Sequence, residues 1–421
     1  MKAWRSAAGL FVAWLLLASG VAAQEGRLTC GQPRNPVVGT LDELTWRQLN
    51  DIYRVVGEER YDEAYEDLTK MLSRAGRDAY LQAILNQALA QVEWARGQFE
   101  AALGYFDTAL ELDALPDSVH YALLYQAAQL YYMSDRLDEA LDHLRLWFCS
   151  VSPEQTTATA WVLKASILSR QGDFAGALDA IEAAIELEES PQESWYQLKL
   201  AAQYELEQYE RAVETLETLL ARWPERKSYW IRLAQTHYAL GQDQDALAAQ
   251  ALAYRNGLLD ESPDVLFLAG LYSKLQLPYK AAMVLEQAMR DGILAADRDH
   301  WAQVAESWRA AGELERALAA WESAGQAAED GLTDLHRGYL LTDLERWTPA
   351  LEALNRSLAR GGLDDRQAGE AYLLRGMVQF KLGDLEAAAV DWERARQLES
   401  SRAAARQWLN YLREERRRRA S

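Results

Sequence analysis

Ten alanine residues recur along this chain at intervals of 33 to 38 residues. They are Ala64, Ala102, Ala140, Ala177, Ala212, Ala246, Ala281, Ala317, Ala350 and Ala388. A constant period in this range is typical of a repeat array, in which each repeat buries its apolar face against its neighbours. The sequence therefore predicts a stacked scaffold, and a scaffold of this kind is expected to bind partners and not to be an enzyme.

Large apolar residues surround most of these alanines at fixed distances. They occupy nine of the ten positions four residues after the alanine and eight of the ten positions three residues before it. Offsets of three, four and seven lie on one face of a helix. Twelve residues before the alanine, eight of the ten positions hold Ala or Gly. Two columns of small residues on two helices allow a close approach, so each repeat is predicted to be a pair of helices.

Glycine recurs five residues before the alanine in half of the repeats, at Gly97, Gly172, Gly241, Gly312 and Gly383. Glycine can adopt the left-handed conformation that ends a helix, so each repeat is predicted to be helix A, a tight turn and helix B. Aromatic residues begin helix A in several repeats, at Trp161, Tyr196, Trp230, Trp301 and Tyr372, and Pro224 ends the fifth. The pattern resembles the tetratricopeptide repeat, W-x2-L-G-x2-Y, then A-x3-F, then P.

This resemblance implies an all-α fold: a right-handed α-solenoid of about ten helix pairs over residues 45–397, with a C-terminal capping helix. The repeats are expected to start near residues 45, 83, 121, 158, 193, 227, 262, 298, 331 and 369. The sixth repeat departs from the pattern, because Asp243 and Gln250 stand where apolar residues are usual.

The first 23 residues have the features of a secretory signal peptide. Lys2 and Arg5 precede an apolar run from Ala7 to Ala18, and Val21-Ala22-Ala23 supplies small residues for cleavage. A membrane anchor is the alternative, but 12 apolar residues are too few to span a bilayer. We therefore expect an exported protein that is cleaved near Ala23 and has no integral membrane segment afterwards. Residues 24–44 are expected to form an extended segment.

The chain contains two cysteines, Cys30 and Cys149. Cys30 belongs to the Pro- and Gly-rich entry segment, and Cys149 lies at the end of helix B of the third repeat. In an oxidising compartment an even pair can form a disulfide, which would fasten the entry segment over the first three repeats. Two separate thiols are the alternative, and the sequence leaves both possibilities open.

Residues 398–421 predict a basic helix and tail. Trp408, Leu409, Tyr411 and Leu412 give it an apolar side, and Arg413 and residues 416–419 make its end basic. A polar terminal helix is the usual cap of a solenoid, and arginines stabilise the negative end of the helix dipole. Contact between the arginines and lipid phosphates is the alternative.

The charge balance and the missing motifs exclude several classes of function. A net charge of −20 disfavours nucleic-acid binding, which needs a basic surface, although it suits a basic partner or simple solubility. The five histidines are scattered without ligand spacing, and the chain lacks a nucleophile elbow, a phosphate loop and a paired-cysteine zinc motif. We therefore predict no catalytic residues, no cofactor and no metal.

One column of helix A is rich in aromatic residues. Position twelve is aromatic in five of the ten repeats, at Trp94, Tyr132, Tyr204, Tyr238 and Phe380. Three glutamines stand three residues before members of this column, at Gln91, Gln129 and Gln235. Rings can cover apolar side chains of an extended peptide while amides pair with its backbone. The hypothesis is a partner-binding groove on the concave face, centred on Trp94, Tyr132, Tyr204 and Tyr238. The alternative is that these rings pack between neighbouring A helices.

Two stretches narrow the resemblance further. The first runs from Trp230 through Ala253-Tyr254-Arg255-Asn256-Gly257-Leu258 to Leu277-Pro278-Tyr279-Lys280-Ala281-Ala282, and the second is the tail from Ser401 to Leu412. They are similar to the periplasmic tetratricopeptide repeat proteins associated with TonB–ExbB–ExbD energy-transduction systems. The resemblance implies a periplasmic scaffold for protein–protein interactions, an accessory component of TonB-dependent outer-membrane transport. Its partners would be TonB, ExbB, ExbD or an outer-membrane receptor.

Two other functions stay open at this point. One is a scaffold for another envelope process, such as outer-membrane assembly or polysaccharide export. The other is a cell-wall enzyme, which the missing catalytic motifs disfavour.

Overall fold

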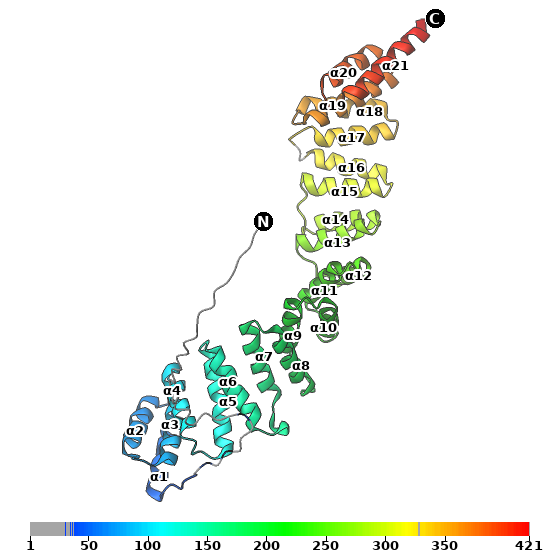
Figure 1. Cartoon of the computed structure of the whole chain (residues 1–421). Helices are drawn as coiled ribbons and strands as arrows, with labels where there is room; N and C mark the ends of the chain where they lie inside the picture. The colour runs from blue at the N-terminus through cyan, green and yellow to red at the C-terminus, as the bar shows by residue number, and fades with distance from the viewer. Residues whose placement is uncertain (1–29, 31–33, 35, 37, 327–328, 421) are drawn as a thin grey trace, which may run out of the picture. The chain divides into compact units, whose positions relative to one another are not determined.

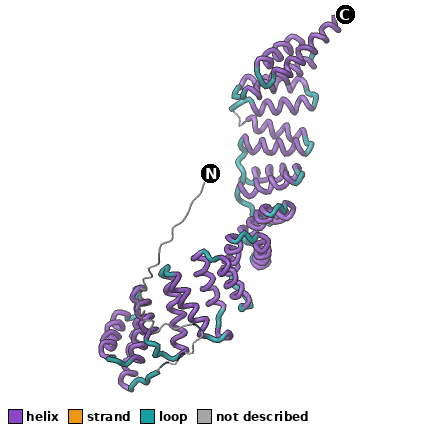
Figure 2. Tube along the Cα trace, viewed as in Figure 1, coloured by secondary structure: helices purple, strands orange, loops and turns teal. Residues whose placement is uncertain are grey.

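The structure is a computed structural model that describes residues 38–326 and 329–420, together with Cys30, Arg34 and Pro36 (Figure 1). These residues form 21 α-helices and one short 3-10 helix, and they include no strand (Figure 2). The prediction of an all-α fold is therefore confirmed. The predicted signal peptide lies outside the described residues, as does most of the predicted extended segment before Val38. No helix in the described part of the chain is long and apolar enough to cross a bilayer.

The helices belong to two compact units, and the chain passes from one unit to the other between Leu206 and Glu207. Unit 1 contains the helices α1 (Glu43–Gly57), α2 (Tyr61–Arg74), α3 (Ala79–Ala95), α4 (Phe99–Glu111), α5 (Asp117–Met133), α6 (Leu137–Ser150), η1 (Pro153–Gln155), α7 (Ala158–Gln171), α8 (Phe174–Glu186) and α9 (Glu193–Glu205). Each odd-numbered helix from α1 to α7 packs against the helix that follows it, and each pair packs against the next pair. Unit 1 is therefore a stack of helix pairs.

Unit 2 contains α10 (Tyr209–Arg222), α11 (Lys227–Ala239), α12 (Asp243–Arg255), α13 (Ser262–Lys274), α14 (Pro278–Arg290), α15 (Arg298–Ala310), α16 (Leu314–Gln326), α17 (Leu332–Asp343), α18 (Trp347–Arg360), α19 (Asp365–Lys381), α20 (Leu385–Gln397) and α21 (Arg402–Ala420). In unit 2, each odd-numbered helix from α11 to α19 packs against the helix that follows it. The last helix, α21, packs on α20.

The ten recurring alanines occupy one equivalent place in these units. Each is the fourth residue of an even-numbered helix, and each is fully buried, with 0% of its surface exposed. The residues twelve positions earlier, on the odd-numbered helices, are also buried. The small columns therefore lie where the helices pack, as the spacing predicts.

The turn inside each pair has the same backbone conformation in all ten repeats. The residue five positions before the alanine has a positive φ every time: the five predicted glycines have φ between 72° and 89°, and five other residues have φ between 54° and 62°. Those five are Glu59, Asp135, Glu207, Gln276 and Glu345. A side chain in this region costs about 1 kcal/mol relative to glycine, so the repeat geometry overrides local preference at half of the turns.

Three odd-numbered helices begin four residues earlier than the repeat pattern predicts. These are α3, α5 and α19, which start at 79, 117 and 365 instead of 83, 121 and 369. Capping explains two of these starts. The Asp78 side chain accepts a hydrogen bond from the Leu81 N–H, and Asp364 forms a reciprocal capping box with Gln367. A cap satisfies N–H groups that have no partner in the helix and so adds one turn.

In the irregular sixth repeat, a buried polar residue replaces the large apolar residue of the other repeats. Gln250 occupies the position of the large apolar residue on α12 and is fully buried. Its Nε2 atom donates a hydrogen bond of 3.0 Å to the Asp264 carbonyl oxygen on α13. One buried hydrogen bond to the next helix thus accompanies the loss of an apolar contact.

Gly376 on α19 lies at a close contact between two helices. A Cβ atom there would lie 2.6 Å from Nε1 of Trp392, a fully buried ring on α20. We expect Gly376→Ala to destabilise the protein by about 1–3 kcal/mol, because the ring cannot move away without losing its packing. Thermal unfolding followed by circular dichroism measures the effect.

The matched control is Gly270→Ala on α13, where the same change meets no atom within 4 Å. This variant should gain about 1 kcal/mol, because alanine is the better helix former. Equal melting temperatures of the two variants would contradict the packing argument.

Candidate functional site

The predicted aromatic column in unit 1 consists of half-buried rings. Trp94 on α3 makes an edge contact with Phe106 on α4, with ring centres 6.2 Å apart. Tyr132 on α5 lies beneath the Arg170 guanidinium of α7, whose central carbon is 5.1 Å from the ring centre. Tyr204 on α9 is also half-buried. Of the two glutamines predicted here, Gln91 is exposed and Gln129 is partly buried.

In unit 2 the predicted residue is Tyr238 on α11. Its side chain is 44% exposed and makes an edge contact with Phe267, with ring centres 5.5 Å apart. The Lys274 ammonium of α13 lies 4.3 Å from the ring centre, and the same ammonium is 2.7 Å from Asp243. Gln235 is exposed. A cation from the next odd-numbered helix therefore lies over each of the Tyr132 and Tyr238 rings.

These contacts combine features of both sequence interpretations. Trp94, Tyr132 and Tyr238 pack against side chains of neighbouring helices, and they stay partly exposed, with cations over Tyr132 and Tyr238. A surface of this composition can hold an extended peptide. Binding of a partner at Trp94, Tyr132, Tyr204 and Tyr238 stays a prediction.

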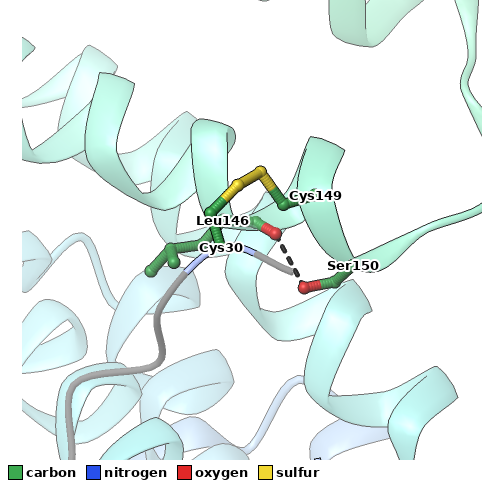
Figure 3. Close-up of a disulfide and its surroundings, with 4 residues drawn as sticks. All are labelled: Cys30, Leu146, Cys149 and Ser150. Carbon is green, nitrogen blue, oxygen red and sulfur yellow. Dashed lines mark hydrogen bonds between the residues drawn. A yellow bond between two sulfur atoms is a disulfide. The ribbon is translucent and has the colours of Figure 1, made fainter. Parts of the chain in front are cut away.

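The two cysteines are joined in the structure. Cys30 and Cys149 form a disulfide with their Cα atoms 5.4 Å apart (Figure 3). Cys149 lies in the last turn of α6, where the Ser150 hydroxyl donates a hydrogen bond of 2.7 Å to the Leu146 carbonyl oxygen. The entry segment is therefore covalently attached to the third helix pair.

Arg34 provides a second attachment, which the sequence did not indicate. Its side chain is only 2% exposed, although arginine is rarely buried. The guanidinium donates hydrogen bonds of 2.7 Å to Asp113 and Asp117 and of 3.0 Å to the Leu115 carbonyl oxygen. Nothing in the local sequence distinguishes Arg34 from an exposed arginine, because its partners are about 80 residues away. We call Cys30 and Arg34 together the N-terminal strap.

A buried histidine lies beside the strap. His120 on α5 is fully buried, and its Nδ1 atom is 3.9 Å from Asp113. The pKa of His120 is lowered to about 4, first by burial and next by the positive charge of Arg34, while Asp113 and Asp117 act in the opposite direction. The imidazole is therefore neutral at physiological pH and forms part of the core.

An open hollow of about 620 Å³ lies next to Cys30, between α4 and α6. Its polar wall contains Tyr131, whose hydroxyl donates a hydrogen bond to Asp107, and His143, whose Nε2 is 3.4 Å from the same carboxylate. Burial raises the pKa of Tyr131, and the hydrogen bond to Asp107 raises it further. A phenol held neutral in this way is a hydrogen-bond donor and not a base.

A second hollow, of about 410 Å³, lies between α19 and α21 in unit 2. It includes Phe380, a member of the predicted aromatic column, together with Trp408 and Tyr411 of α21. The sequence assigned these last two residues to the apolar side of a capping helix. No group of three or more His, Cys, Asp or Glu side chains in the described residues has the arrangement of a metal site.

Comparison with known families decides the assignment of the fold. A model of the tetratricopeptide repeat matches residues 88–147, 201–263 and 335–401, and a second model of the same repeat matches residues 158–191. These matches together cover somewhat more than half of the chain. The chain belongs to the tetratricopeptide repeat proteins.

Several solved structures are similar to this chain at low sequence identity. A tetratricopeptide repeat protein from Parabacteroides merdae is 15% identical, with a TM-score of 0.31 over 61% of this chain and 98% of that one. YrrB, a tetratricopeptide repeat protein with an unusual peptide-binding site, is 18% identical, with a TM-score of 0.36 over 44% and 89%. Cut9–Hcn1 of the APC/C is 12% identical, with a TM-score of 0.33 over 88% and 96%. No curated protein sequence matches this tetratricopeptide repeat protein.

The disulfide predicts the thiol content of the purified protein. Denatured, unreduced protein should expose no free thiol to a thiol reagent, and two should appear after reduction. Because the bridge closes a loop of 119 residues, Cys149→Ser should lower the free energy of unfolding by about 5 kcal/mol. The double variant with Cys30→Ser should lose no more than the single one. Two free thiols before reduction would show that the cysteines are separate.

His120 predicts a loss of stability in mild acid. Its pKa of about 4 in the folded protein lies below the ordinary value of 6.5. Between these values the unfolded chain binds a proton that the folded chain does not, so stability falls as the pH falls. Between pH 7 and pH 5 the loss should be about 2 kcal/mol.

His120→Leu tests this pH dependence, because it removes the titrating group and places an apolar side chain in the buried position. The difference in urea midpoint between the two pH values should shrink in the variant. An unchanged difference would assign the acid sensitivity to other groups.

Proposed function

We propose that this protein is a periplasmic scaffold that binds protein partners as an accessory component of a TonB-dependent outer-membrane transport system. The observation that carries the binding role is the repeated helix pair. The same position of α3, α5, α9 and α11 presents a partly exposed ring, and on α3 and α11 an exposed glutamine, Gln91 or Gln235, stands three residues before it. A row of equivalent positions suits an extended partner segment, which also has a regular spacing.

The disulfide supports an exported location. Disulfides form and persist in oxidising compartments such as the bacterial periplasm and are rare in the cytosol. Cys30 and Cys149 are the two cysteines of the chain, and they pair with each other. The apolar run near the N-terminus, with its small-residue cleavage site, points in the same direction.

The TonB assignment is supported by the two stretches that resemble the family. The first spans α11 to α14 and the second forms much of α21. Pro278 is the first residue of α14, where a missing N–H costs nothing because that group has no partner inside the helix. The resemblance therefore lies in well-formed structural elements.

The proposed mechanism is positional. A stack of helix pairs holds a segment of one partner through many small contacts, and it raises the local concentration of that partner near the membrane machinery. No chemical step is required of the scaffold. Its contribution is the geometry of successive odd-numbered helices.

Site-specific photocrosslinking in living cells tests the proposal. A photoreactive residue at Gln91, exposed on α3, should capture TonB, ExbB, ExbD or an outer-membrane receptor, identified by mass spectrometry. The matched control carries the same residue at Glu66, exposed on the even-numbered helix α2, and should capture less of that partner.

Two results would contradict the proposal. Capture of a different envelope complex from Gln91, with none of these proteins, would leave the scaffold role and remove the TonB assignment. Equal capture from Gln91 and Glu66 would show that the odd-numbered helices are not the binding surface.

A further inference from the structure

The hollow between α19 and α21 has the size and composition of a side-chain pocket. Its volume is about 410 Å³, and its walls are Met377, Phe380 and Lys381 from α19 and Gln407, Trp408 and Tyr411 from α21. Four of these six residues are large and apolar, one is a cation and one is an amide. This is the usual composition of a ligand pocket, in which apolar walls are combined with a few polar groups that orient the ligand.

The aromatic walls are held in place from below. Trp392 is fully buried on α20, where its Nε1 donates a hydrogen bond of 3.1 Å to the Leu373 carbonyl oxygen. Trp408 stacks on this ring with centres 5.1 Å apart. A pocket wall built on a fixed ring needs little reorganisation on binding.

The open side of the pocket is formed by Tyr411. Its ring lies 5.6 Å from Phe380 and 6.0 Å from Trp408, yet the residue remains 45% exposed. An incoming ring can therefore contact three aromatic residues while displacing only water. Partly exposed aromatic residues of this kind are frequent anchors of protein interfaces.

The charge around the pocket is opposite to that of the whole chain. The net charge of the chain is −20, whereas α21 contains seven arginines and two glutamates. Lys381 stands at the pocket itself, 5.6 Å from the centre of the Trp347 ring, and has no carboxylate partner among the described residues. The basic charge therefore favours an acidic ligand.

One arginine of α21 holds this helix against α20 and does not contribute to the basic charge beside the pocket. Arg416 donates hydrogen bonds of 2.8 Å to Glu386 and of 3.2 Å to the Leu385 carbonyl oxygen, and so fastens α21 to α20. Glu414 and Glu415 separate Arg413 from the run of arginines at residues 416–419. A hollow with these aromatic walls takes a single apolar side chain, which a peptide supplies and a lipid headgroup does not, so an acidic peptide suits it better than a lipid surface.

We propose that the α19–α21 pocket binds an acidic segment of a partner protein through one large apolar side chain. That side chain enters between Phe380, Trp408 and Tyr411, and the neighbouring carboxylates of the segment face Lys381 and the arginines of α21. The Gln407 amide can pair with the backbone of the segment. The inference rests on the proposed scaffold role and adds to it a second surface, distinct from Gln91 and its neighbours.

Fluorescence anisotropy with a defined probe tests the proposal on the full chain. The probe is a fluorescein-labelled oligoglutamate peptide with one central phenylalanine. It should bind, while the same peptide with a central alanine and an oligolysine peptide with phenylalanine should bind much more weakly. Tyr411→Ala and Lys381→Glu should each raise the Kd by about tenfold, because they remove the exposed wall and reverse the charge at the pocket.

Two control variants match these changes away from the pocket. Tyr53→Ala removes a tyrosine on α1 that is 43% exposed, and Lys70→Glu reverses an exposed charge on α2. Both should leave the Kd unchanged. Circular dichroism confirms that the four variants keep their helix content, which is expected because the substituted side chains are largely exposed.

Three results would overturn the proposal. They are absence of binding by the phenylalanine probe, an equal Kd for the pocket variants and the controls, and competition by phosphatidylglycerol vesicles whose own binding Tyr411→Ala does not weaken. The last result would assign the arginines of α21 to a membrane. Failure of the probe together with specific capture from Gln91 would refute the pocket and leave the proposed function standing, whereas failure of both would refute both.

Discussion

Every helix pair in this protein depends on small side chains at the place where its two helices pack. Ten alanines on the even-numbered helices are fully buried, and the facing columns are mostly alanine or glycine. Because the backbones can approach closely there, large residues such as Trp392 can fill the remaining space without a void. The helix ends, the turns and the exposed faces follow from this contact, since it fixes the position of each helix relative to its partner.

Contacts that recur with the repeat could be predicted, and contacts that occur once could not. The alanine period located the helix pairs, and five glycines located half of the turns. The other five turns contain residues such as Asp135 and Glu345, which adopt the same positive φ although their own preference opposes it. Tertiary packing outweighs a local cost of about 1 kcal/mol, and a single sequence does not display that balance.

The candidate surfaces also divide into features that recur with the repeat and features that occur once. The aromatic column was visible because it repeats, but the cations above Tyr132 and Tyr238 come from the next odd-numbered helix and depend on how the pairs stack. The burial of Arg34 depends on Asp113 and Asp117, about 80 residues away. The α19–α21 pocket required knowledge that α21 lies across Phe380. These features are products of the assembled array and have no local signature.

The N-terminal strap changes how the first repeats can come apart. Arrays of this kind gain stability from contacts between neighbours, so their ends ordinarily open one repeat at a time. Cys30 forms a disulfide with the third helix pair, and Arg34 donates hydrogen bonds to the residues that join the second pair to the third. Opening of the first pair alone would therefore leave its chain fastened at both ends. The first three pairs should behave as one cooperative block, while unit 2 keeps the gradual opening that is ordinary for repeats.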